Sequence, residues 1–212
     1  MRVVKMVRHC LFLECKKSEK PWVIFTSRST PYDLMVTDLP HEGFDPLDML
    51  DTQKDIDDCV IEFQDKIHPL WKSERIGRTS YEGLKHKSGS GNVNNTIFSA
   101  LTTAVKATIA GRKDKFGAGS DFDACYYYPM IILDGRLFEA YLQSGEIQVR
   151  EVNSVMFSFY YQSRQYKREQ FIVPILTEGA LKDFLLFLDS VLLFLGNLVE
   201  QQIQKHPPTE IA

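Results

Sequence analysis

Apolar residues recur along the chain with two different spacings, and these spacings predict its strands and helices. Two short apolar runs, residues 8–14 and 21–26, predict strands that are joined by the charged turn KKSEK. From residue 95 to residue 110 apolar side chains recur every three or four positions and Gly111 follows, which predicts an amphipathic helix that ends there. A second helical pattern, with acidic residues at its start, covers residues 55–71.

Aromatic and β-branched runs dominate the second half of the sequence and predict further strands, because such side chains favour a pleated, half-buried surface. These strands are expected at residues 125–135, 136–145, 147–152, 155–163 and 170–176. A long helix is expected to follow from Leu181 to about Lys205. Polar, Gly-rich composition predicts loops at 28–50, 72–95 and 111–123.

This order of elements, with strands first and then a helix, further strands and a long C-terminal helix, predicts a mixed α/β or α+β domain. At 212 residues and 24.4 kDa the chain can bury a substantial core, and one domain is expected. We place this domain at residues 1–205, with 206–212 as a short tail.

Composition and charge narrow the classes of protein further. The chain is 44% hydrophobic and 25% charged, which is typical of a globular protein and not of a disordered one. The formal net charge of −3 gives no overall sign of nucleic-acid binding, although a local patch needs no net charge. The apolar stretch 181–199 contains Lys182, Asp183 and Asp189, so its uninterrupted runs are too short to span a bilayer and no membrane partner is expected.

The cysteines show no paired spacing of the kind that zinc sites and redox motifs use. They are Cys10, Cys15, Cys59 and Cys125. A disulfide framework is not expected in a chain of this size, and cysteines beside a strand fit the role of small apolar residues. This use of cysteine predicts a reducing, cytoplasmic setting. The basic and then apolar N-terminal segment has no small-residue cleavage site, so it is not expected to be a signal peptide.

Glu14 and Lys16 stand two positions apart at the end of the first predicted strand. Because side chains alternate between the two faces of a strand, these two residues share one face. A glutamate can bind a hard divalent cation, and an adjacent ammonium can hold a water molecule or stabilise charge on a phosphoryl group. The same spacing also fits an ordinary ion pair at a solvated strand end, so spacing alone leaves both interpretations open.

The segment ECKKSEKPWVIF, in which an E-x-K strand runs through a short turn into a tryptophan-containing strand, resembles the PD-(D/E)XK superfamily of restriction-endonuclease-like proteins. The resemblance covers residues 8–26 in detail and extends by the order of elements to about residue 176. It implies a restriction-endonuclease-like α/β fold, with a mixed central sheet flanked by helices and a long C-terminal helix. It also implies a Mg²⁺-dependent nuclease site with DNA as the expected partner. In such a site Glu14 matches the metal-binding acid, the carbonyl of Cys15 a backbone metal ligand, and Lys16 the catalytic lysine.

One part of the family pattern is missing from this sequence. The family places an acid on the strand before the E-x-K strand, and no Asp or Glu precedes Glu14 here. One carboxylate alone binds Mg²⁺ poorly, because hard cations need several oxygen ligands. Three explanations remain: the chain lacks an upstream acid-bearing strand, the fold persists without the activity, or the acid has moved to another element. The candidates for a moved acid are Asp33, Asp121, Asp123 and Asp134.

Four basic residues are candidates for nucleic-acid contacts. Lys85 and Lys87 precede the glycine-rich stretch SGSGN, a candidate flap over a phosphate backbone. Lys106 lies on the polar side of the predicted helix, where the family often places a polar residue beside its site, and Arg112 belongs to the basic run GRKDK. A flexible loop and a solvated helix face explain the same residues without any ligand.

A function of a different class is a non-catalytic interaction or dimerisation module. The stretch 181–199 is apolar on too many sides for a simple surface helix, which favours its burial by a partner or in a deep core. The sheet and this helix would then form a dimer or cap a larger assembly. A homo-oligomer is expected because of this apolar helix. The two functions do not exclude each other.

Overall fold

A computed structural model describes residues 7–28, 41–43, 75–82, 96–114, 124–186 and 188–189. The strands are β1 (Val7–Lys17), β2 (Trp22–Arg28), β3 (His41–Gly43), β4 (Arg75–Glu82), β5 (Ala124–Asp134), β6 (Leu137–Gln143), β7 (Glu146–Glu151), β8 (Ser154–Ser163) and β9 (Tyr166–Thr177). The helices are α3 (Thr96–Lys113) and a C-terminal helix at 178–186 and 188–189.

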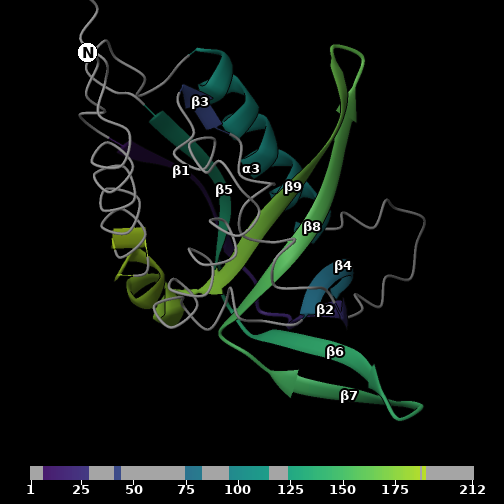
Figure 1. The fold of residues 1–212 in the computed structure, drawn as a ribbon. Helices are drawn as coiled ribbons and strands as arrows, with labels where there is room; N and C mark the ends of the chain where they lie inside the picture. Colours follow the sequence, from purple (N-terminus) through teal and green to yellow (C-terminus); the bar gives the residue numbers. More distant parts are fainter. Residues whose placement is uncertain are drawn as a thin grey trace, which may run out of the picture.

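The described strands form one mixed sheet in the order β1-β5-β9-β8-β4-β2-β6-β7, and β3 pairs with β5 beside this path (Figure 1). β1, β5 and β9 are parallel neighbours, whereas β8–β9, β2–β4 and β6–β7 are antiparallel pairs. Parallel neighbours require a crossover, and α3 lies in the connection between β1 and β5. The predicted class, a mixed α/β fold with helices against a mixed sheet, is confirmed.

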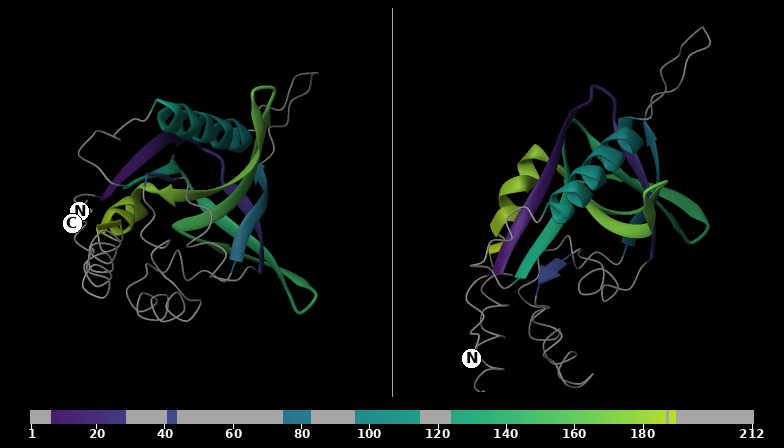
Figure 2. Two further views of the ribbon diagram at one scale, coloured as in Figure 1. Left: turned by 45° about the horizontal axis from the view of Figure 1, so that its top comes forward. Right: turned by 90° about the horizontal axis from the view of Figure 1, so that it is seen from above.

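α3 covers one face of the sheet and forms the main core with it (Figure 2). Ile97, Leu101 and Val105 recur at helical spacing along its buried side. They pack in one cluster with alternate residues of the strands, among them Ile131 of β5 and Ile175 of β9. The β8–β9 hairpin extends alongside the helix, so α3 has the sheet beneath its buried face and this hairpin at its side.

α3 packs on β1 at a position that has no side chain. A Cβ atom at Gly111 would collide with the ring of Phe12. The prediction that the helix ends at Gly111 is wrong, because α3 continues to Lys113. The glycine permits a close approach of helix and strand, a role that a helix-end pattern cannot distinguish from termination.

The other face of the central strands is also buried. Tyr128 and Ile132 of β5 alternate with the residues that face α3, and both are inaccessible or nearly so. The C-terminal helix lies on this side of β1 and β5, with Phe184 and Leu188 buried (Figure 2). The described part of this helix ends at 189, so its predicted extension to about Lys205 stays a prediction.

Two segments that were expected as loops contain strands. β3 lies within the expected loop 28–50, and β4 lies within 72–95. The β4 sequence RIGRTSYE has little apolar periodicity, and its extended form depends on pairing with β2 and on a bridge from Gly77 to β8. A Cβ at Gly77 would collide with Ile24, so this pairing brings strands together more closely than a side chain allows. The helix predicted at 55–71 lies outside the described residues.

Candidate functional site

Glu14 and Lys16 lie on β1 with their side chains on the same face, as strand alternation predicts. The Nζ atom of Lys16 lies 2.7 Å from Oε1 of Glu14, so the two groups form a direct ion pair. The exposed fraction is 19% for the Glu14 side chain and 31% for the Lys16 side chain. Both charged groups are therefore largely enclosed and still reachable from solvent.

The face that carries this ion pair is the one covered by α3. Glu14 is in register with Ile131 of β5, and Lys16 is in register with Leu133, so the four side chains point to the same side. Ile131 and Leu133 are fully buried in the cluster beneath α3. The ion pair therefore stands at the margin of the main core, with an apolar flank on one side.

Among the described residues, Glu14 is the one carboxylate at the Glu14–Lys16 site. Nowhere among them do three or more His, Cys, Asp or Glu side chains come together as a metal site requires. The carbonyl of Cys15 could add one oxygen, but the charge of Glu14 is already balanced by Lys16. Because Mg²⁺ takes about six oxygen ligands, these residues do not hold the ion by themselves.

Asp134, one of the acids considered as a displaced metal ligand, belongs to the opposite face of the sheet. It is in register with Lys17, and its carboxylate lies 3.4 Å from the Lys17 Nζ atom. Neighbouring positions of a strand face opposite sides, so Asp134 and Lys17 point away from Glu14. The other three candidate acids lie outside the described residues.

Of the three lysines that are candidates for nucleic-acid contacts, the structure describes Lys106. Lys106 lies on the exposed side of α3, away from the sheet and from the ion pair on β1. Lys85 and Lys87 fall outside the described residues. A contact of these three lysines with nucleic acid therefore stays a prediction.

Arg112 joins the end of α3 to β9. Its guanidinium donates to both carboxylate oxygens of Glu169, at 2.8 and 2.9 Å, and to the hydroxyl of Tyr166 at 3.2 Å. The hydrogen bonds with Glu169 are the main reason why the pKa of Arg112 is raised above its ordinary value. The planar, bidentate geometry binds helix to hairpin and occupies donors that a phosphate would otherwise use.

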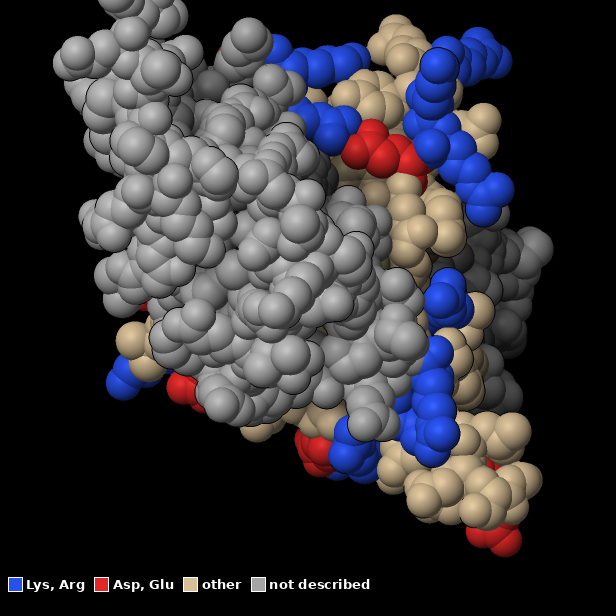
Figure 3. Space-filling view, in the orientation of Figure 1, with Lys and Arg blue, Asp and Glu red and all other residues tan. Residues whose placement is uncertain are grey.

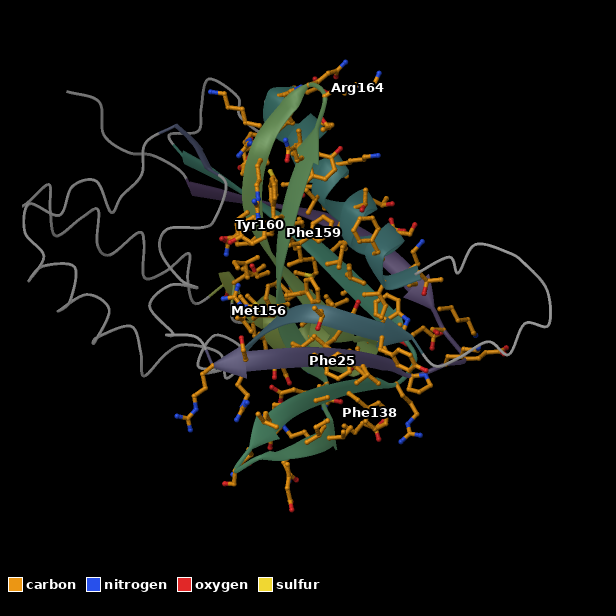
Figure 4. All side chains as sticks on the ribbon, turned by 90° about the vertical axis from the view of Figure 1, so that its right-hand side faces the viewer. Phe25, Phe138, Met156, Phe159, Tyr160 and Arg164 are labelled. Atoms are coloured by element: carbon orange, nitrogen blue, oxygen red, sulfur yellow. The ribbon has the colours of Figure 1, made fainter. Side chains whose placement is uncertain are left out.

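The end of the β8–β9 hairpin carries cations that the sequence analysis did not single out. Arg164, Lys167 and Arg168 are exposed there, and Figure 3 shows Lys and Arg side chains gathered over this end of the molecule. The guanidinium carbon of Arg168 lies 4.6 Å from the ring centroid of Tyr160, an exposed aromatic residue of β8 (Figure 4). The signal was present in YYQSRQYKRE, where aromatic and basic residues alternate across a turn.

A buried carboxylate lies in the β2–β6–β7 part of the sheet. Glu139 of β6 is 3% exposed, and its Oε1 accepts a hydrogen bond of 2.7 Å from the hydroxyl of Thr26. Its Oε2 accepts a hydrogen bond of 2.7 Å from Nε of Arg150. Both oxygens thus have partners, which is what allows a carboxylate to remain in this place. The position was predicted only as part of a strand, since nothing local distinguishes it from an exposed Glu.

Comparison of the chain with protein-family models, with curated proteins and with solved structures found no match in any of the three. Among the described residues, no helix combines the length and the apolar character that crossing a membrane requires.

Proposed function

We propose that the protein binds nucleic acid and that Glu14 and Lys16 form one half of a phosphodiester-cleaving site in a restriction-endonuclease-like fold. The observation that carries this proposal is their shared position on the helix-covered face of β1, 2.7 Å apart and partly exposed. An acid and an ammonium in direct contact beside an apolar core provide a metal-ligand oxygen and a cation for a phosphate.

The order of elements around the pair supports the same proposal. The E-x-K strand β1 is followed by the tryptophan-containing strand β2, and the later strand β5 lies parallel to β1. α3 packs over both β1 and β5, where the resemblance places a helix beside the site. Trp22 itself is fully buried in the main core, so its part in the pattern is structural.

Cleavage in such a site needs a second carboxylate from outside the described residues. β1 pairs with β5 along one edge, and no described strand pairs with its other edge. A strand with an acid could add there beside Glu14. Mg²⁺ held by two such acids would polarise the phosphodiester, and Lys16 would stabilise the charge that develops on it.

The nucleic-acid partner is supported by the cations at the end of the β8–β9 hairpin. Arg164, Lys167 and Arg168 offer positive charge for a phosphate backbone, and Tyr160 offers an exposed ring for stacking. We propose DNA as the substrate because of the family resemblance. A reducing, cytoplasmic setting completes the proposal and is supported by Cys15 of β1, an exposed free thiol.

A cleavage assay tests this function. The full chain is incubated with supercoiled plasmid DNA and Mg²⁺ or Mn²⁺. We expect the plasmid to be nicked, and we expect Glu14→Gln and Lys16→Met each to abolish this nicking. Lys17→Met is the matched control, because Lys17 also pairs with an acid but on the opposite face. Nicking that survives Glu14→Gln, or that Lys17→Met removes equally, would exclude this site as its source.

A second candidate function is an interaction or dimerisation module, and one observation favours it. Several large apolar side chains of β2, β6 and β7 are exposed on the outer face of the sheet. A contiguous apolar surface on a globular protein is commonly a docking surface. This function does not require the Glu14–Lys16 site, and the two can be tested separately.

A further inference from the structure

The outer face of the β2–β6–β7 part of the sheet is apolar. Phe25 of β2 is in register with Ala140 of β6, which is in register with Val149 of β7, so the three side chains lie on one face. Ile24, the neighbour of Phe25, points to the other face and into the main core. Figure 4 shows Phe25 and Phe138 on these neighbouring strands.

The apolar face is most open on the β6–β7 hairpin. Leu142 is 68% exposed, Ile147 is 70% exposed and Val149 is 58% exposed. Leu142 and Ile147 are paired across the hairpin, and Val149 follows two positions later on the same face. A single exposed apolar side chain is ordinary on a protein surface. Three adjacent exposed apolar side chains form a patch that water solvates poorly.

β7 ends the path of the described strands and has β6 as its one described neighbour. Its sequence EIQVRE contains no lysine and no proline, and its ladder with β6 has no register shift. Lysine, proline and bulges are three of the devices by which edge strands avoid further pairing. β7 is a regular strand whose outer edge has none of these protections.

The hairpin turn shows which backbone groups point to this edge. Ser144 and Gly145 have φ angles of 52° and 84°, which makes the loop a type I′ turn closed by Gln143 and Glu146. The closing pair of such a turn is hydrogen-bonded, and bonded and non-bonded pairs alternate along an antiparallel ladder. The N–H and C=O groups of Ile147 and Val149 therefore point outward.

An antiparallel copy of β7 fits this edge in one register. With Gln148 opposite Gln148 of the second copy, Ile147 faces Val149 across the junction and both side chains lie on the apolar face. On the other face Glu146 then stands opposite Arg150 of the second copy. The Arg150 side chain is 59% exposed although its guanidinium also binds Glu139. A register centred on Val149 would instead place Ile147 opposite Glu151, and one centred on Arg150 would oppose two arginines.

We propose that β7 pairs with β7 of a second copy of this chain, antiparallel and centred on Gln148, and so joins two sheets into one. About four backbone hydrogen bonds, two apolar pairs and two Glu–Arg pairs form across the junction. The apolar faces of the two hairpins become continuous. This proposal specifies the partner of the second candidate function and is independent of the Glu14–Lys16 site.

The mass of the full chain in solution tests the interface. Sedimentation over a range of concentrations is expected to show a dimer of twice 24.4 kDa, with a dissociation constant on the order of micromolar, as fits a small interface. Glu146→Arg places arginine opposite Arg150 and is expected to weaken the dimer about tenfold or more. Gln143→Arg is the matched control, because it adds an arginine at the same end of the hairpin but on β6.

A cysteine placed at the dyad tests the register. Gln148→Cys brings two Cα atoms to about 4.5 Å, within the range of a disulfide, and is expected to crosslink under mild oxidation. Ile147→Cys places equivalent atoms more than about 7 Å apart and is expected not to crosslink. Both variants are made with Cys15→Ser, because Cys15 is an exposed free thiol.

A monomer at every concentration would overturn the proposal. So would a dimer that Glu146→Arg leaves intact, or one that crosslinks through Ile147→Cys and not through Gln148→Cys, since these outcomes assign another surface or another register. None of these results bears on plasmid nicking by Glu14 and Lys16, so failure of this interface and failure of the nuclease proposal are distinguishable.

Discussion

Phe12 of β1 lies with its ring in the space that a side chain at Gly111 of α3 would fill. Phe12 shares a face of β1 with Glu14 and Lys16, so this contact places the helix over the strand that carries the candidate site. The glycine and the ring together determine how near α3 comes to β1.

Replacement of Gly111 by alanine tests this contact. An alanine in an open helical position stabilises a helix by about 1 kcal/mol relative to glycine. Here the added methyl group meets the ring of Phe12, and we expect Gly111→Ala to lower the free energy of unfolding by about 1–3 kcal/mol, measured by urea denaturation. Phe12→Leu in the same chain makes room, so the double variant should lose less stability than the sum of the two single variants.

Glu139 offers a comparison between a buried and an exposed carboxylate on the same hairpin. Glu139→Gln removes the charge that Arg150 binds in a place that is 3% exposed, and we expect a loss of about 1–3 kcal/mol in the free energy of unfolding. Glu151, which binds Arg136 through both oxygens but is exposed, is the matched control. Glu151→Gln should leave the denaturation midpoint nearly unchanged. Equal effects of the two changes would contradict the role assigned to burial.

The cations at the end of the β8–β9 hairpin are expected to carry nucleic-acid binding. The double change Arg164→Ala and Lys167→Ala should weaken binding of a short labelled DNA duplex and reduce the slope of log K against log salt by about 1–2. Fluorescence anisotropy at several salt concentrations measures both quantities. Lys182→Ala, an exposed cation on the C-terminal helix, serves as the control. An unchanged salt slope in the double variant would remove this surface from the proposal.

The strands with strong local signals could be predicted from the sequence. β1, β2 and β5 to β9 consist of apolar, aromatic and β-branched runs with turn residues between them, so their existence follows from side-chain alternation. β4 could not be predicted in this way. Its polar sequence becomes a strand through neighbours that come from distant parts of the chain, and a local pattern carries no information on such pairing.

The candidate site, like the fold, could be predicted from the sequence only in part. That Glu14 and Lys16 share a face follows from the period of a strand, and their ion pair agrees with it. That this face is the one covered by α3 depends on the register of β1 with β5, which the sequence does not reveal. The same register separates Asp134 from Glu14, although both acids stand near the ends of adjacent strands.

The central proposal is that Glu14 is a metal ligand whose second acid comes from residues outside the described part of the chain. The most direct measurement is a titration of the full chain with Mn²⁺, followed by the paramagnetic resonance signal of the free ion. We predict saturable binding of about one Mn²⁺ per chain that Glu14→Gln abolishes and that Asp134→Asn, on the opposite face, leaves intact. Absence of saturable binding, or binding that Glu14→Gln does not change, would contradict the proposal.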